Sequence, residues 1–361
     1  MQLIDWRVAE FTGTRLVPAG PRLGLVETVA IVEDLRARAQ RADGHVAEVT
    51  GLDPAGESAT TVVVDRQEWI RANVESFRIL TDPVIATVLE KRANDGVGPF
   101  VETVGSRAAG AEVGALLSYL ATRVLGQFEL IGPARVEGDK NPAGRLTLVA
   151  PNIVAAERAL EVDPGDFRLW VCLHEVTHRT QFAAAPWLHE HVQQLLTDYL
   201  VASDLDASAL LRRLRQAVAS IRGGWDQAPG SLVELVQTPE QGAILDRVTG
   251  LMSLLEGHAD VVMDTVGPAV IPSVATIRQR FDKRRRDAKP LGRIVRRLLG
   301  VELKLRQYAE GAAFVRAVVD KVGMAGLNVV WSDPDQLPTA AEIREPARWL
   351  TRTAVPPAIR A

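Results

Sequence analysis

The chain of 361 residues has little cysteine, few aromatic residues and no long hydrophobic run. A single cysteine, Cys172, excludes an internal disulfide framework and is typical of a reducing compartment. No stretch reaches the about 18 uncharged apolar residues that a membrane-spanning helix needs, and the early charges Asp5 and Arg7 predict no secretory signal. The sequence therefore predicts a cytoplasmic protein without a membrane span.

A strong net charge is also absent. The net charge is −3, with 24% charged and 47% hydrophobic residues, which excludes the disordered and fibrous classes. The length allows a large core or two domains. We expect an N-terminal helical region over residues 1–126, a central core over 127–270 with a helical insertion, and a C-terminal helical region over 271–361 that packs on the core.

Histidine is scarce, with 6 residues in the chain, yet two of them stand in the pattern His-Glu-x-x-His at His174 to His178. A helix turns by about 100° per residue, so the two imidazoles lie roughly 40° apart on one face and can reach one metal ion. Glu175 projects from the flank of that face, where a carboxylate can take a proton from water. The pattern predicts a zinc site with Glu175 as general base. The alternative is a pair of core histidines with incidental spacing.

The surrounding sequence favours a buried helix. Asp163 is a predicted N-cap, Pro164 suits the first helical position, and the residues that follow are apolar on nearly every face. We expect this helix to run from about Pro164 to Phe182. Cys172 would point away from the ligand face as a small buried residue.

A catalytic zinc ion needs a third protein ligand, and the best candidate is Glu256 in a predicted helix from about Pro239 to Val266. Asp260 shares its face and could orient a ligating histidine. His258 lies about 200° round the helix from Glu256, so it is an alternative third ligand rather than an additional one. A third possibility is that Glu256 forms an ion pair with an arginine such as Arg247.

The remaining pattern is mostly helical, with helices expected over Pro21 to Ala42, from Pro83 onward and over Ala111 to Leu125. Strands are expected near Phe128 to Ile131, Ala134 to Val136 and Arg145 to Ala150. Helices are also expected over Trp187 to Val201, Ala207 to Ile221 and Leu303 to Val322. The fold class is therefore mainly α, in the α+β sense, with a small sheet.

Together, His174, Glu175 and His178 with the downstream Glu256 and Asp260 resemble zincin metallopeptidases of the gluzincin type. That resemblance implies a zincin-like catalytic core, zinc as cofactor, Glu256 as third ligand and Asp260 as a histidine support. The longer context resembles a family of actinobacterial zincin-like proteins described as hydrolases or metalloproteases, some associated with deazaflavin-cofactor biosynthesis. We identify no residues expected to bind that cofactor. In zincins the strand before the metal helix is an edge that pairs with peptide substrate; here residues 145–150 could be that edge or an ordinary strand covered by the N-terminal region.

Two further features could have a function. Tyr308 could stabilise a tetrahedral oxyanion, although packing is the more common role for such a tyrosine. The segment 278–297 carries ten basic residues against two acidic ones, which suits an anionic partner such as nucleic acid or, more commonly, a solvated helix face.

Three functions follow from these features. The first, which the intact Glu175 favours, is a zinc hydrolase that cleaves a peptide or small amide substrate. The second is an inactive zincin fold that serves as a binding protein or scaffold. The third is an anion- or nucleic-acid-binding helical protein that uses the basic run.

Overall fold

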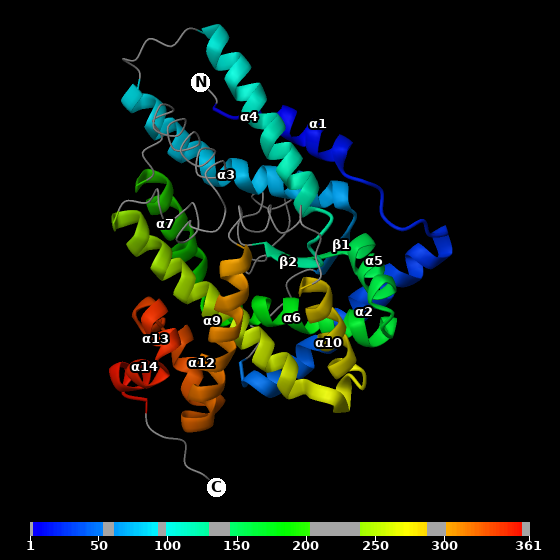
Figure 1. Cartoon of the computed structure of the whole chain (residues 1–361), viewed down its shortest axis with the longest axis vertical. Coiled ribbons are helices and arrows are strands. Elements are labelled where there is room, and N and C mark those ends of the chain that lie inside the picture. The colour runs from blue at the N-terminus through cyan, green and yellow to red at the C-terminus, as the bar shows by residue number, and fades with distance from the viewer. Residues whose placement is uncertain are drawn as a thin grey trace, which may run out of the picture. The chain divides into compact units, whose positions relative to one another are not determined.

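Helices dominate the computed structural model, which describes residues 3–52, 61–92, 99–129, 145–202, 239–286 and 301–355 (Figure 1). This confirms the expected mainly α fold with a small sheet. The chain forms two units: unit 1 contains residues 1–186 and 262–283, and unit 2 contains residues 187–261 and 284–361.

Unit 1 holds the sheet and the helix that carries the His-Glu-x-x-His pattern. Its elements are α1 (Trp6–Leu16), α2 (Leu25–Thr50), β1 (Thr61–Val64), α3 (Arg66–Arg92), α4 (Pro99–Leu120), β2 (Gly126–Glu129), β3 (Arg145–Val149), α5 (Ala150–Leu160), α6 (Pro164–Ala184) and most of α10 (Val274–Arg286). The last turns of α9 (Pro239–Val270), from Val262 onward, also belong to this unit.

The sheet has three strands in the order β1-β3-β2, with β1 parallel and β2 antiparallel to β3. Leu146, Thr147, Leu148 and Val149 are all buried, as expected for a strand that is covered on both faces. Of the two roles left open for residues 145–150, the substrate-pairing edge is wrong, because both edges of β3 are already hydrogen-bonded within the sheet. Residues 145–149 are therefore an ordinary strand, and β1 from the N-terminal region pairs with one of its edges.

Helix α6 begins as the sequence predicts. The Asp163 side chain accepts a hydrogen bond from the amide of Asp166 at 2.8 Å, and Pro164 takes the first position. The helix ends at Ala184, two residues beyond the predicted Phe182. Its buried apolar residues between Phe167 and Val176 lie in one hydrophobic core with residues from α2, α5, β3 and the end of α9, which fixes α6 within unit 1.

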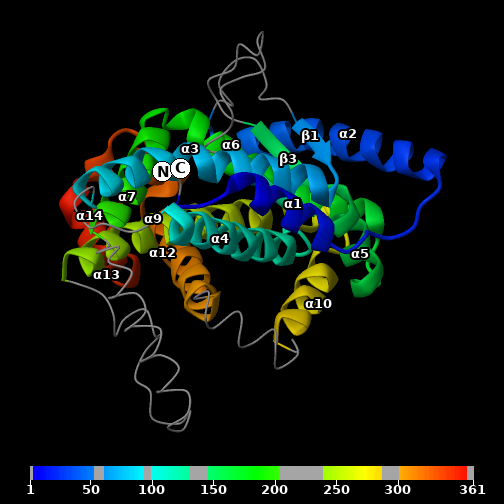
Figure 2. The same ribbon diagram turned by 90° about the horizontal axis from the view of Figure 1, so that it is seen from above.

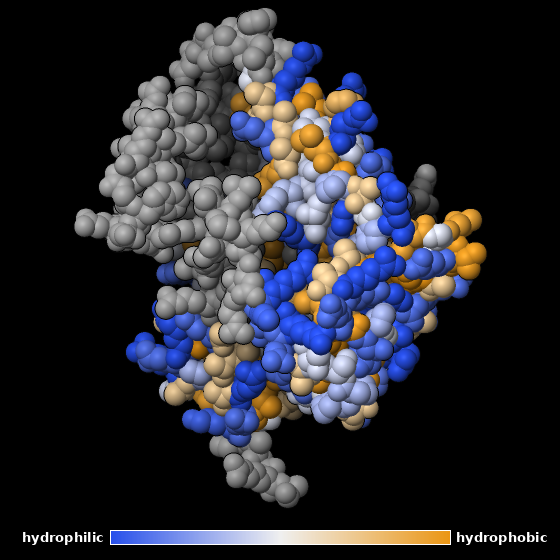
Figure 3. All heavy atoms as spheres, turned by 45° about the vertical axis from the view of Figure 1, so that its right-hand side comes forward, coloured by the Kyte–Doolittle hydropathy of each residue, from blue (hydrophilic) through white to orange (hydrophobic). Residues whose placement is uncertain are grey.

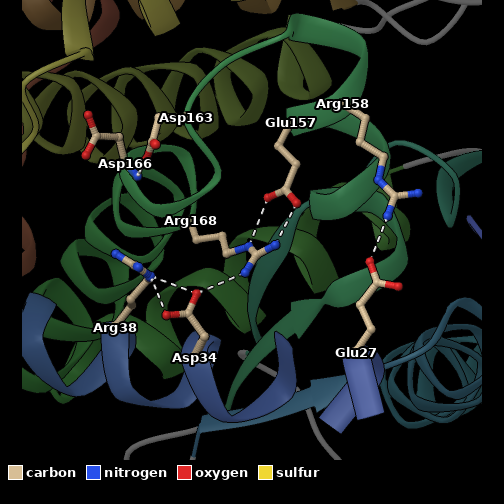
Figure 4. A network of polar contacts seen from close by, with 8 residues as sticks. All are labelled: Glu27, Asp34, Arg38, Glu157, Arg158, Asp163, Asp166 and Arg168. Atoms are coloured by element: carbon tan, nitrogen blue, oxygen red, sulfur yellow. Dashed lines mark hydrogen bonds and ion pairs between the residues drawn. The ribbon is translucent and has the colours of Figure 1, made fainter. Parts of the chain in front are cut away.

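A charged network ties α6 to α2 and α5 (Figure 4). Arg168 donates to both oxygens of Glu157, at 2.6 and 2.9 Å, and reaches Asp34 at 3.1 Å. Burial raises the pKa of the Asp34 carboxyl, but hydrogen bonds and charges from Arg38 and Arg168 outweigh burial and hold that pKa below its ordinary 3.8. Arg158 and Glu27, in the same figure, form an ion pair with both side chains about half exposed.

Glycines allow α1 and α4 to lie side by side, as Figures 1 and 2 both show. A Cβ added at Gly114 would lie 2.4 Å from the carbonyl oxygen of Ala9, and one added at Gly110 would lie 2.3 Å from that of Asp5. Two helix backbones can approach this closely only where no side chain stands between them.

Unit 2 contains α7 (Trp187–Ala202), α9 up to Val261, α12 (Val301–Leu327), two 3-10 turns at Asn328–Trp331 and Pro334–Gln336, and the short helices α13 (Ala340–Arg344) and α14 (Pro346–Thr353). A Cβ on Gly257 of α9 would lie 2.2 Å from the backbone of Gly311 in α12, so these two helices cross in direct contact.

Several N-terminal elements differ from the sequence prediction. Helix α2 runs over Leu25–Thr50 rather than 21–42, and α4 runs over Pro99–Leu120 rather than 111–125. The helix expected to begin at Pro83 is the second half of α3, which begins at Arg66. There, Asp65 and Glu68 form a capping box, each side chain accepting from the other residue's amide. Strand β1 was not predicted, although its β-branched Thr-Val-Val-Val sequence is a strand signal. The expected segments 134–136 and 207–221, and the second half of the basic run, lie outside the described residues.

The face drawn in Figure 3 mixes hydrophilic and hydrophobic side chains. Exposed large apolar residues include Leu25 and Val26 at the start of α2 and Phe11 on α1. Among the described helices, none has both the length and the hydropathy needed to span a bilayer.

We expect Arg168→Met to lower the free energy of unfolding by about 3 kcal/mol, because it leaves the buried Glu157 carboxylate without its charge partner. Arg158→Met is the matched control and should cost less than about 1 kcal/mol, since its ion pair is exposed. Urea unfolding at pH 7 measures both values.

The same network predicts a pH dependence. A carboxyl whose pKa is lower in the folded than in the unfolded chain stabilises above the unfolded value and loses that contribution as the pH falls through the folded value. Asp34 is such a group, so stability should fall below about pH 4 in the wild type and fall less in Arg168→Met. Equal acid sensitivity of the two proteins would contradict this role for Arg168.

Candidate metal centre

The two histidines of α6 point at a common position. Nε2 of His174 and Nε2 of His178 are 3.2 Å apart, and both side chains are partly buried. Two ligands of a tetrahedral zinc ion, each at about 2.0 to 2.1 Å, lie about 3.3 Å from each other. The nitrogen pair therefore has the separation that one zinc ion requires.

Gln181 holds the ring of His178 in this orientation. Its amide oxygen accepts a hydrogen bond from Nδ1 of His178 at 3.0 Å, and Gln181 is fully buried. An amide oxygen can only accept, so Nδ1 carries the proton and the lone pair of Nε2 is available to a metal. Gln181 is a functional residue that was not predicted from the sequence, although its place three positions after a ligand on the same helix was an available signal.

Glu175 lies on the flank of the same helix and is 7% exposed. Its carboxylate faces β2, where a Cβ built on Gly126 would be 2.8 Å from Oε1. The general-base candidate is thus enclosed by protein on the strand side.

Glu256 and Asp260 are both partly buried on α9. Two imidazole nitrogens on α6 and the Glu256 carboxylate on α9 are, within the described ranges, donors that could hold a metal ion. His258 is fully buried, and its ring packs edge-on against Trp331 with 5.4 Å between the ring centroids.

Other candidates from the sequence have different surroundings. Burial, with a smaller effect from the charge of Glu175, raises the pKa of the Cys172 thiol to about 12, so this cysteine is an unreactive core residue. Tyr308 falls within α12, but its side chain lies outside the described residues.

Two arginines in the described part of the basic segment 278–297 make contacts within unit 1. Arg278 pairs with Asp264 at 2.7 Å, and Arg280 donates to the carbonyl oxygens of Leu160 and Glu161 at the end of α5. These contacts satisfy helix-terminal carbonyls and an acid, which is a structural use of the charge. Lys283 and Arg284 are exposed.

Comparison with known proteins gives a family model and a solved structure that are similar to this chain. A family model described as a zincin-like metallopeptidase matches residues 4–350. The crystal structure of a proposed hydrolase with a novel fold from Chloroflexus aurantiacus is similar at 31% identity and a TM-score of 0.67, covering 97% of this chain and 99% of that one. No curated protein matches the chain. Neither match concerns a deazaflavin cofactor, so that association remains a prediction from resemblance.

We expect Gln181→Met to weaken zinc binding by about 10- to 100-fold, because the ring of His178 loses the acceptor that fixes its orientation. Thr177→Val is the control: it removes a buried hydroxyl that donates to the Leu173 carbonyl within the helix, and it should leave zinc affinity unchanged. Competition with a chelating dye gives both dissociation constants. Equal values for the two variants would refute the role of Gln181.

Proposed function

Because this chain belongs to the zincin-like metallopeptidase family, we propose that it is a zinc-dependent hydrolase that cleaves a peptide or small amide substrate. The observation that carries the proposal is the 3.2 Å separation of the two Nε2 atoms on α6. Nitrogen pairs with this spacing and this degree of burial suit a shared cation. The intact Glu175 beside them suits catalysis better than a scaffold role.

We assign the three protein ligands to His174, His178 and Glu256. The chemistry of these donors supports this set, because imidazole nitrogens and a carboxylate are ordinary zinc ligands, and a zinc site with three protein ligands keeps one position open for catalysis. Two observations argue against His258 as the third ligand. It lies about 200° round α9 from Glu256, and its ring packs on Trp331. Asp260, one turn after Glu256, is assigned the role of orienting a histidine.

A bound zinc ion would supply Lewis acidity toward a carbonyl oxygen and would lower the pKa of a water molecule to about 7. In this scheme Glu175 accepts the proton of the attacking water at its carboxylate and returns it to the leaving nitrogen. Its low exposure keeps bulk water from competing for that proton. Gln181 keeps the proton of His178 on Nδ1, away from the reacting groups.

Replacing the base separates catalysis from metal binding. We expect Glu175→Gln to bind zinc as the wild type does and to lose about 10²- to 10⁴-fold in kcat on a library of fluorogenic peptides and small amides. Glu190→Gln, at an exposed position on α7, is the matched control and should be fully active. A zinc-loaded wild type that hydrolyses none of these compounds, or full activity in Glu175→Gln, would overturn the proposal.

The third ligand is tested by the pair Glu256→Gln and His258→Phe. We expect Glu256→Gln to lower zinc affinity by at least about 100-fold, since an amide is a poor substitute for an anionic ligand. His258→Phe should keep one zinc ion per chain, because Phe can fill the ring position against Trp331. The opposite result, with zinc lost only in His258→Phe, would reassign the third ligand.

A further inference from the structure

Gly126, the first residue of β2, lies directly against the side chain of Glu175. An ideal Cβ built on Gly126 would be 2.5 Å from Cγ, 2.6 Å from Cδ and 2.8 Å from Oε1 of Glu175. Real Cβ atoms essentially never approach other heavy atoms this closely. Any side chain at position 126 would therefore occupy space that the Glu175 side chain now fills.

The contact belongs to a matched pair of surfaces. Gly126 and Phe128 share one face of β2, because side chains alternate along a strand. Glu175 and Phe182 share one stripe of α6, because seven residues complete nearly two helical turns. Phe128 stacks on Phe182 with 5.3 Å between ring centroids, which aligns the strand along this stripe and brings Gly126 opposite Glu175.

Strand β2 cannot retreat from α6. Its backbone pairs with β3 in the register Gly126 to Leu148, and the carbonyl oxygen of the preceding Leu125 accepts from the amide of Val149 at 2.9 Å.

The opposite face of β2 is fixed as well. There the Gln127 side-chain oxygen accepts from the indole of Trp69 at 2.8 Å, and its amide nitrogen donates to Asn73 at 3.2 Å. With the strand held by β3, α3 and α6, a clash at position 126 has to be relieved by the longer and more flexible side chain, which is that of Glu175.

We propose that Gly126 is a positioning residue for the general base: the missing side chain at this point of β2 sets where the Glu175 carboxylate lies relative to His174 and His178. The catalytic consequence rests on the proposed function, whereas the positional one does not. The φ angle of Gly126 lies outside the left-handed region, so alanine is compatible with the backbone and the substitution isolates the clash.

Gly126→Ala should displace the Glu175 carboxylate by roughly 1 Å, since ordinary carbon contacts begin near 3.5 Å. We expect a loss of about 10- to 100-fold in kcat, with KM and zinc affinity unchanged, because a misplacement of this size is enough to disturb proton transfer. Gly44→Ala is the control, because the space around its Cβ position on α2 is open, and it should have the kcat, KM and zinc affinity of the wild type. Crystal structures of the wild type and both variants give the carboxylate position without reference to activity.

A double-mutant cycle with Glu175→Ala keeps the test decisive even where Gly126→Ala destabilises the fold. Glu175→Ala removes the three atoms that the new methyl group would meet, so the drop in Tm caused by Gly126→Ala should disappear in that background. An equal drop in both backgrounds, or an unmoved carboxylate with wild-type kcat, would overturn the proposal. An inactive wild type whose carboxylate still moves in Gly126→Ala would refute the hydrolase function and leave the positional claim intact.

Discussion

Two imidazole nitrogens converge on one face of α6, and the chemistry proposed for this protein depends on that convergence. Without a metal, nitrogens 3.2 Å apart must share a proton, because two lone pairs facing each other repel. The bond from Nδ1 of His178 to Gln181 already fixes one ring as an acceptor at Nε2. A divalent cation in place of the shared proton would satisfy both nitrogens at once, which is the electrostatic reason for proposing a metal centre here.

The two imidazoles keep this arrangement because contacts on several sides fix the position of α6. Asp163 fixes its first turn, Arg168 ties it to the buried Glu157, and its apolar residues between Phe167 and Val176 lie within the main hydrophobic core of unit 1. Near its end, Phe182 stacks on Phe128 of β2. Burial of nearly the whole helix surface makes rotation of α6 costly, so the directions of its side chains are set by packing rather than by the metal.

Local features of the sequence were sufficient to predict α6 and the shared face of His174 and His178, because caps and helical periodicity act over a few residues. The prediction of a helix start at Pro83 is wrong, because α3 already begins after the capping box formed by Asp65 and Glu68. The central place of β3 could not be predicted, because it depends on pairing with β1, which is distant in the chain. Gly126 left no signal at all: its role lies in the side chain it lacks, and only the contact with Glu175 makes that visible.

The central claim is that His174, His178 and Glu256 bind one zinc ion. Anomalous diffraction at the zinc absorption edge, from crystals of the protein grown with stoichiometric zinc, tests it most directly. The account predicts one strong peak about 2.1 Å from Nε2 of each histidine and from an oxygen of Glu256. No peak between the two imidazoles, or a zinc ion bound there by His258 without Glu256, would contradict it.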